Sequence, residues 1–329
     1  MFTKLSYAAC ACVFSLGLVT ASAALGQDGT TMGLSEAARA DIPEEVIDGV
    51  VRPTLKYDNA TVVTAGVGLR NRASGAIELG GLPVGAQMQR VFLYWNIITS
   101  GEPPAGADKM TIQRVGPGSN PSATVTGKVI GQGSTPCWGG DRNVVYRALV
   151  PRRVVNQNGT YLITLPNNVA GKTDGTNPWD GNTLPAYNGA SLVAVAEGSG
   201  HVMIYEEPIS GRMFSSSLQY RLRVPVPARV SSLMILHMIN SDGQSGGANY
   251  SDAAGTAREI VNVNGLRVSG QTSDGYDSDW NGATGGRVHQ LWDNAIRALP
   301  NGLVSNQARV RHVAGADCLV PVANVLETR

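Results

Sequence analysis

An acidic segment that ends in glycine has the residue types of a calcium-binding loop. Residues 277–282 (DSDWNG) match the first half of an EF-hand-type loop, in which alternating oxygen ligands surround a hard cation and glycine permits the tight turn. The twelfth position, where a bidentate glutamate belongs, is Val288, so an EF-hand is excluded. Two interpretations stay open. Either Ca²⁺ is held by Asp277, Asp279 and Asn281 with backbone carbonyls, or the segment is a surface turn.

Two long loops contain aromatic residues of the kind that stack on sugar rings. Trp179 and Tyr187 lie in residues 167–189, and Tyr250 lies in residues 240–257. Long loops in a compact domain are usually functional or disordered. These aromatics are therefore candidate glycan ligands, and the alternative is that they anchor the loops to the fold.

No complete catalytic set is recognisable in the chain. Asp180 and Asp242 lie in the same two loops, and Glu206 and Glu207 are adjacent carboxylates of the kind that glycosidases use in pairs. Spacing alone assigns none of them. The segment that begins at Asp242 (DGQSGG) is similar to the nucleophile segment of chymotrypsin-like proteases, but no matching histidine segment precedes it. We assign no catalytic residue.

Arginine is the predominant basic residue of this chain, with 21 Arg against 5 Lys. Residues 218–224 (LQYRLRV) alternate between apolar and polar types, which predicts a strand with one solvated face. Arg221 and Arg223 then share that face, and their guanidinium groups suit bidentate contacts with anionic glycans. The alternative is an ordinary solvated sheet face.

The histidines and cysteines do not form a metal-binding pattern. His201, His237, His289 and His312 have no metal-ligand spacing, and no CxxC pair occurs. Outside the leader, only Cys137 and Cys318 remain. An even number of cysteines in an exported chain predicts that they form a disulfide, with two buried free thiols as the alternative.

The remaining pattern predicts the elements that must position these residues. Apolar runs of strand length alternate with clusters of Gly, Pro, Asn, Asp and Ser. The runs 91–98 and 232–239 are almost continuously apolar, which predicts strands buried on both faces. Short helical segments are expected only at 34–48 and 293–299. We predict an all-β fold, a β-sandwich or jelly roll with long loops and little helix.

Several strands resemble the DUF3344-like family of secreted bacterial and archaeal surface proteins. The similar segments are 88–95 (MQRVFLYW), 81–86 (GLPVGA), 158–161 (NGTY) and 187–195 (YNGASLVAV), and the likeness extends over residues 58–327. The resemblance implies an extracellular β-sandwich that is often part of a larger surface protein. It implies no catalytic residues.

The N-terminus has the pattern of a secretory signal peptide. Lys4 precedes an apolar run at 8–19 and a small-x-small cleavage site at 21–23, with an uncleaved anchor as the alternative. We predict a signal peptide over 1–23, a segment over 24–46 that is a short helix or disordered, and one β-sandwich domain over 47–329. The predicted location is secreted, periplasmic or on the cell surface, with no membrane span after cleavage.

The amino-acid composition limits the classes of partner that we expect. The net charge is +1, so the chain has no global basic field and a nucleic-acid partner is not expected. Our first hypothesis is a non-enzymatic surface or matrix protein that binds a cell-surface or matrix component such as a glycan, with Ca²⁺ as a candidate stiffening ion. The second hypothesis is a secreted hydrolase or lyase that acts on a polysaccharide or another polymer through loops 167–189 and 240–257.

Overall fold

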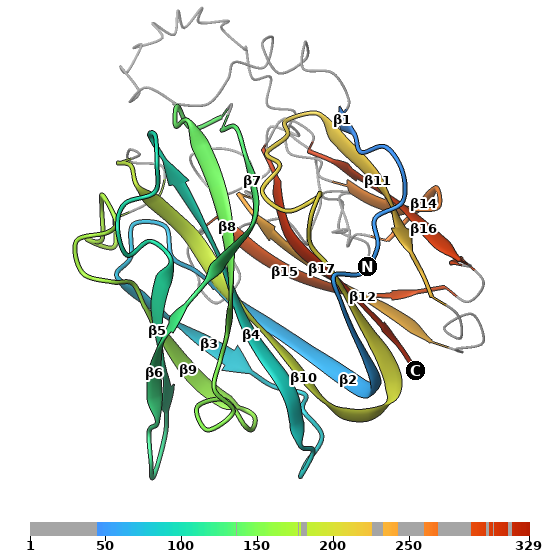
Figure 1. Cartoon of the computed structure of the whole chain (residues 1–329), viewed down its shortest axis with the longest axis horizontal. Coiled ribbons are helices and arrows are strands. Elements are labelled where there is room, and N and C mark those ends of the chain that lie inside the picture. Colours follow the sequence, from blue (N-terminus) through green and yellow to red (C-terminus); the bar gives the residue numbers. More distant parts are fainter. Residues whose placement is uncertain are drawn as a thin grey trace, which may run out of the picture.

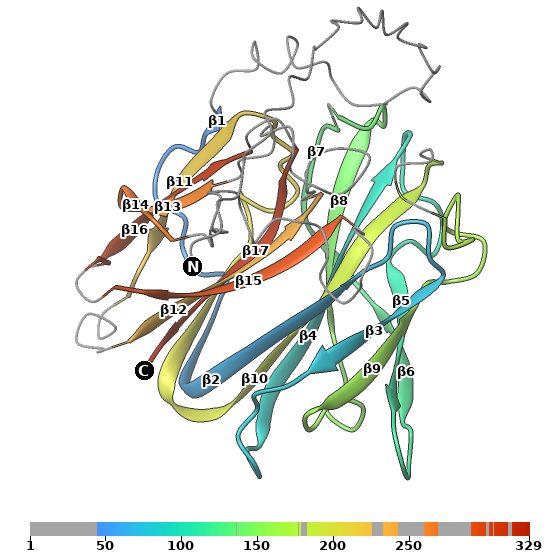
Figure 2. The same cartoon turned by 180° about the vertical axis from the view of Figure 1, so that it is seen from behind.

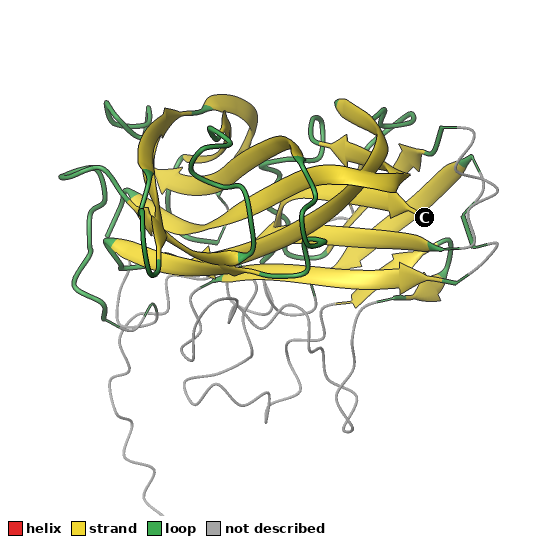
Figure 3. Cartoon of the chain, turned by 90° about the horizontal axis from the view of Figure 1, so that it is seen from below, coloured by secondary structure: helices red, strands yellow, loops and turns green. Residues whose placement is uncertain are grey.

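The structure is a computed structural model. It describes residues 45–135, 137–176, 178, 183–225, 233–242, 260–268, 291–300, 303–304, 306–314 and 318–329. The regular secondary structure of these residues consists of β-strands, and no helix occurs among them (Figure 3). The all-β prediction is therefore confirmed. None of the described segments is a helix long and apolar enough to cross a membrane.

The strand bounds are as follows. In chain order they are β1 (Glu45–Val46), β2 (Leu55–Gly68), β3 (Ser74–Leu79), β4 (Met88–Thr99), β5 (Lys109–Val115), β6 (Ser122–Thr126), β7 (Lys128–Gly133), β8 (Arg142–Leu149), β9 (Gly159–Thr164), β10 (Ala186–Tyr205), β11 (Ser217–Arg223), β12 (Met234–Ser241), β13 (Ile260–Val263), β14 (Leu266–Arg267), β15 (Trp292–Leu299), β16 (Gln307–Val313) and β17 (Val320–Thr328).

These strands form three sheets. The largest has the order β15-β12-β17-β10-β4-β8-β7, with β2 also paired to β10. A four-stranded sheet (β3-β9-β5-β6) and a five-stranded sheet (β1-β11-β16-β13-β14) lie on opposite sides of it (Figures 1 and 2). Both smaller sheets are outer layers, and each turns one face to solvent.

Strand alternation explains why the central strands are apolar throughout. In β4, Val91, Leu93 and Trp95 pack toward the four-stranded sheet, whereas Phe92 and Tyr94 pack on the opposite side. Successive side chains of a strand point to opposite faces, so a strand that is covered on both sides needs apolar residues at every position. The expectation of two-sided burial is confirmed for β4 and, in the same way, for β12.

The large sheet folds back on itself at one shared bend. Strands β2 and β10 pair along their length and turn together (Figure 1), with the register of β10 shifting between Glu197 and Gly200. A Cβ atom on Gly200 would lie 1.8 Å from the carbonyl oxygen of Thr328, so only glycine fits there. The bend brings the β4–β8 half against the β12–β17 half, and their facing side chains make a third hydrophobic core.

Two helix expectations need correction. Residues 293–299 belong to strand β15, which pairs residue by residue with β12, from Asp293 opposite Asn240 to Leu299 opposite Met234. The exposed edge of β12 provides hydrogen-bond partners along this whole segment, and tertiary pairing overrides a weak local propensity. Of the helical segment expected at 34–48, Glu45–Val46 is the parallel strand β1, and residues 47–48 are not helical. Residues 34–44 lie outside the described residues.

Cys137 and Cys318 are paired, as the sequence predicts. Their Cα atoms are 6.6 Å apart, within the range of disulfides. Cys137 follows β7 and Cys318 precedes β17, so the bond ties together the two halves that the bend brings face to face. A disulfide is compatible with an extracellular location.

Candidate functional site

The solvent side of β11 and β16 forms a surface that we call the arginine face. Leu218, Tyr220 and Leu222 of β11 point into the core, so the residues between them face outward. On β16, Ala308, Val310 and His312 point inward in the same way. The residues between them are Gln219, Arg221, Arg223, Gln307, Arg309 and Arg311, of which Arg221, Arg223 and Arg309 are exposed and the other three are half-buried. Ser217 and Val313 continue the same side at one end, where Ser217 is buried.

Strand register brings these arginines together. Arg221 lies directly opposite Arg309 in the antiparallel pair, and Arg223 is two positions further along β11. All three are exposed. Within the described residues, no carboxylate oxygen lies within 4.0 Å of their guanidinium nitrogens. Like charges opposite each other destabilise a sheet, so this arrangement reduces the stability of the fold instead of adding to it.

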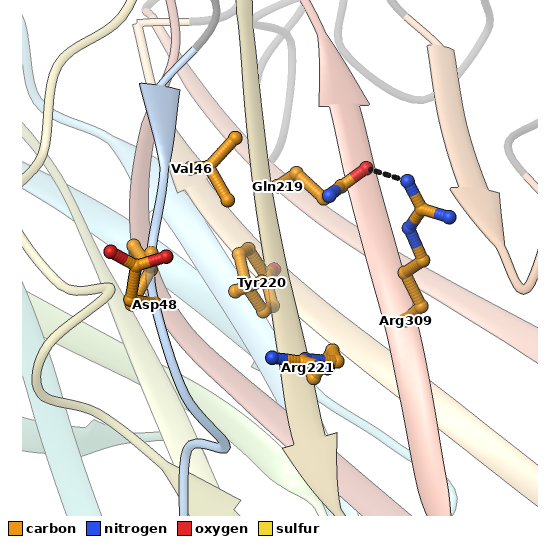
Figure 4. Close-up of a pocket in the computed structure, with 7 residues that line it drawn as sticks. Val46, Asp48, Gln219, Tyr220, Arg221 and Arg309 are labelled. Atoms are coloured by element: carbon orange, nitrogen blue, oxygen red, sulfur yellow. Dashed lines mark hydrogen bonds between the residues drawn. The ribbon is translucent and has the colours of Figure 1, made fainter.

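A groove of about 300 Å³ lies at the β1 side of this face (Figure 4). Figure 4 shows the side chain of Arg221 reaching across the gap toward the chain after β1, where its Nε donates a hydrogen bond to the carbonyl oxygen of Gly49 at 3.3 Å. Arg309 donates to Oε1 of Gln219 at 2.6 Å. Val46, 51% exposed, and Asp48 complete one wall. The groove thus offers guanidinium donors, an amide, a carboxylate and a small apolar surface.

A buried histidine supports the arginine face from beneath. Tyr220 Oη and His312 Nε2 are 2.8 Å apart, and Asn324 donates to Tyr220 Oη at 2.9 Å. Burial lowers the pKa of His312 to about 3, so its ring is neutral at ordinary pH. The face therefore rests on a neutral hydrogen-bonded core, and its charge comes from the arginines alone.

A second polar cluster lies at the disulfide end of the molecule and is fully buried. The guanidinium of Arg70 is 3.7 Å from Asp242 and 4.4 Å from the centre of the Trp138 ring, and it donates to Asn188 at 2.9 Å. Trp138 donates its indole N–H to Asp242. Burial lowers the pKa of Arg70 to about 10, which leaves it charged. Asp242 is 1% exposed, so its carboxylate faces these partners and not the solvent.

Described residues that border the predicted loops lie near this cluster. The amide of Asp242 donates to the carbonyl of Leu291 at 2.9 Å, and Leu184 packs against the group that contains Leu291 and the disulfide. Asp242, Leu291 and Leu184 flank the segments 243–259, 269–290 and 179–182, so the described ends of all three lie together. Trp179, Asp180, Tyr250, Asp277, Asp279 and Asn281 themselves lie outside the described residues.

A third polar cluster includes Glu206 but not its neighbour Glu207. Glu206 is 2% exposed and accepts hydrogen bonds from Tyr94 Oη at 2.8 Å and from Arg147, while Glu207 is exposed to solvent. Burial raises the pKa of Glu206. Since the two carboxylates differ in exposure and Glu206 is paired with Arg147, they do not form a glycosidase-like pair.

Tyr187 is not a surface aromatic, which corrects the expectation of a sugar-stacking role. It belongs to β10, is 1% exposed, and packs in the core beneath the four-stranded sheet. Its hydroxyl donates to the carbonyl of Ala107 at 3.5 Å, and burial raises its pKa. The polar neighbour Asn188, which makes this segment resemble a loop, is itself buried and hydrogen-bonded to Asn96 at 2.8 Å.

Of the predicted ligand residues in the described part of the chain, Arg221 and Arg223 lie on one exposed face as expected. Sequence reasoning missed their neighbours Arg309 and Arg311. The alternation of residues 307–313 (QARVRHV) is the signal that could have found them. Among the described residues, no group of three or more His, Cys, Asp or Glu side chains is placed to hold a metal ion.

Comparisons with known proteins give only distant likenesses. No family model matches the chain, and no curated protein matches it. Among solved structures, the plant receptor-like kinase ANX1 is 8% identical with a TM-score of 0.27, over 82% of this chain and 84% of that one. The β-porphyranase BpGH86A from the human gut bacterium Bacteroides plebeius is 10% identical with a TM-score of 0.24, over 77% of this chain and 38% of that one. The chain covers 32% of BuGH86, solved in complex with neoagarooctaose. These scores support neither a family nor a function, and the DUF3344-like resemblance stays a prediction.

Proposed function

We propose that this chain is an exported, non-enzymatic binding protein of the cell surface or extracellular matrix, and that its arginine face binds an anionic glycan. One observation carries the proposal. Arg221 and Arg309 oppose each other across two paired strands, Arg223 lies beside them, and no described carboxylate neutralises the three. Carboxylate or sulfate groups would supply the missing counter-charge through bidentate contacts.

Charge and exposure distinguish this face from the other candidate chemistry. The carboxylates Asp242 and Glu206 are buried and paired with arginines, so neither is presented to a substrate by the described residues. Arg221, Arg223 and Arg309 of the arginine face are exposed, and the groove provides an additional hydrogen-bonding group at Gln219. A binding role therefore has a surface to support it, whereas a hydrolytic role has no comparable set of exposed groups in this part of the chain.

The test is direct binding to polysaccharides that differ in charge. We expect the chain without its leader to bind polygalacturonate and dextran sulfate but not dextran, with affinity that falls as ionic strength rises. The variant R221A/R223A/R309A should lose affinity by about 1,000-fold, because each of the three charge-assisted contacts contributes about tenfold. The variant K56A/R90A/R153A removes the same number of exposed charges elsewhere and should bind almost as the parent does.

Two results would overturn the proposal. One is binding that does not distinguish dextran from the anionic polymers. The other is an equal loss in the two triple variants, which would show that net charge and not the arginine face is responsible. Release of new reducing ends from any of these polymers would instead favour the hydrolase hypothesis. Unchanged melting temperatures of both variants would show that each is folded.

A further inference from the structure

We infer that the ligand is a linear polyanion that crosses the strands of the five-stranded sheet diagonally, from Arg223 toward Arg311, and not a compact anion held at one point. This inference rests on the proposed function, because it concerns the same arginine face. It adds the shape of the ligand, its direction on the sheet and the minimum length that binds fully.

The pairing register sets the diagonal. Arg223 lies opposite Gln307, Arg221 lies opposite Arg309, and Gln219 lies opposite Arg311. The positive charge is thus on β11 in the first row, on both strands in the second row, and on β16 in the third, where Arg311 is half-buried and donates to Ser217 Oγ at 3.4 Å. Rows of outward residues are about 7 Å apart along a strand and paired strands are about 5 Å apart, so this stripe is about 15 Å long.

The stripe continues beyond β16 in its third row. Arg311 lies opposite Asn262 of β13, and Asn262 lies opposite Arg267 of β14. The third row therefore ends in another arginine, and the distance along the backbone positions from Arg223 to Arg267 is about 20 Å. Asn262 lies between two arginines and offers a neutral hydrogen-bonding side chain.

The opposite side of the stripe is less favourable for an anion. Asp48 is exposed on the far wall of the groove, next to Arg221. A negatively charged chain that passed across β1 would meet this carboxylate, whereas a chain that turns toward β16 meets Arg309 and then Arg311. Charge complementarity therefore favours one diagonal direction.

Positions this far apart do not converge on one small anion. A single carboxylate or sulfate contacts at most one or two of the guanidinium groups, whereas a chain of them contacts several at once. Each further contact is then intramolecular and gains from a high effective concentration, provided that the chain is long enough to span the sites. Affinity should therefore depend strongly on the length of the ligand.

The experiment is a length series. We expect the affinity for oligogalacturonates to rise at least tenfold from the disaccharide to a length that spans the stripe, and then to level off. Arg223→Ala and Arg311→Ala, at the two ends, should lower the affinity for long oligomers by about tenfold and leave disaccharide binding almost unchanged. Arg221→Ala, at the centre, should weaken all lengths.

Controls separate this inference from the proposed function. Arg153→Ala removes an exposed charge elsewhere and should leave the length dependence unchanged. Arg311→Lys keeps the charge without the planar fork, and it should give an intermediate loss. Equal affinity for short and long oligomers, or end variants that weaken the disaccharide as much as the long chains, would overturn the linear arrangement. Failure of every anionic polymer to bind would instead refute the proposed function itself.

Discussion

The two outer sheets each pack an apolar face against the large sheet, but they present different polar groups to solvent. The four-stranded sheet turns hydroxyl groups outward: Ser74, Thr164, Thr111 and Thr124 stand in one row across β3, β9, β5 and β6. We call this surface the hydroxyl face. On the five-stranded sheet, the corresponding row across four strands is Gln219, Arg311, Asn262 and Arg267.

The energetic difference between the faces is instructive. On the hydroxyl face, Oγ1 atoms of Thr111 and Thr124 are 2.9 Å apart, and Thr160 donates to Glu78 at 2.8 Å, so cross-strand neighbours stabilise each other. On the arginine face, Arg221 and Arg309 repel each other. Inward residues of both sheets form the hydrophobic cores, whereas outward residues contribute less to the fold. The arginine face places like charges opposite each other at a cost in stability, which makes it the stronger candidate for binding.

The largest expected effect contrasts a buried arginine with one on the arginine face. Arg147 is paired with Glu206 between the two halves of the large sheet and lies 5.2 Å from the Phe92 ring. Arg147→Met should lower the free energy of unfolding by about 3–5 kcal/mol, because it leaves a buried carboxylate without its partner. Arg221→Met should change it by no more than about 0.5 kcal/mol.

Urea denaturation measures both variants. The double variant R147M/E206L should recover much of the stability lost in R147M, since it removes the unpaired charge as well. Similar losses in R147M and R221M would contradict the comparison, because they would mean that the outer arginines contribute to the stability of the fold.

The next largest effect is expected in acid unfolding, and it also comes from a buried residue. Glu327 accepts hydrogen bonds from Thr61 at 2.5 Å and from Arg329 at 3.0 Å, and His237 lies 3.9 Å away. Burial alone would raise its pKa, but these partners lower it from 4.5 to about 2. Its stabilising contribution is therefore complete above pH 4.5 and is lost as the pH falls toward 2.

Glu327→Gln should accordingly lower the free energy of unfolding at pH 7 by about 1.5–3 kcal/mol and flatten the acid limb of the stability curve. Thermal melts between pH 7 and pH 2 measure the effect. R221A/R309A should leave the shape of the same curve unchanged. A parallel loss of stability for parent and E327Q throughout the acid range would show that another group controls acid unfolding.

Moving two arginines from the arginine face to the hydroxyl face tests whether charge alone is sufficient for binding. Thr111 and Thr164 oppose each other on β5 and β9, as Arg221 and Arg309 do on β11 and β16. In the R221A/R309A background, T111R/T164R should restore part of the affinity for dextran sulfate, about tenfold, and cost about 1 kcal/mol of stability. The variant T111Q/T164Q is the uncharged control. If the arginines restore no binding, the groove beside β1 contributes more than the charge does.

The sequence predicted features that depend on the local pattern within one strand. It did not predict which residues lie side by side on strands that are distant in the chain. A period-two pattern predicted that Arg221 and Arg223 share a solvated face, and a continuous apolar run predicted that residues 91–98 are buried on both sides. The pairing of β11 with β16 joins segments far apart in the chain, so the opposition of Arg221 and Arg309 could not be predicted. Tyr187 was misplaced because its neighbour Asn188 is polar, although partners from other strands satisfy that amide inside the core.

The smallest expected effect concerns the one described carboxylate that lines the groove. At about 6 Å in water-like surroundings, Asp48 would repel a bound anion by about 0.7 kcal/mol, so Asp48→Asn should raise the affinity for a polyanion by about threefold. Calorimetry at low and high ionic strength measures this change, which should vanish at high salt because Asp48 is exposed. Glu78→Gln makes the same change on the hydroxyl face and should have no effect on affinity. Equal gains in both variants would mean that the ligand responds to overall charge, whereas a gain confined to D48N places the anionic chain beside the groove.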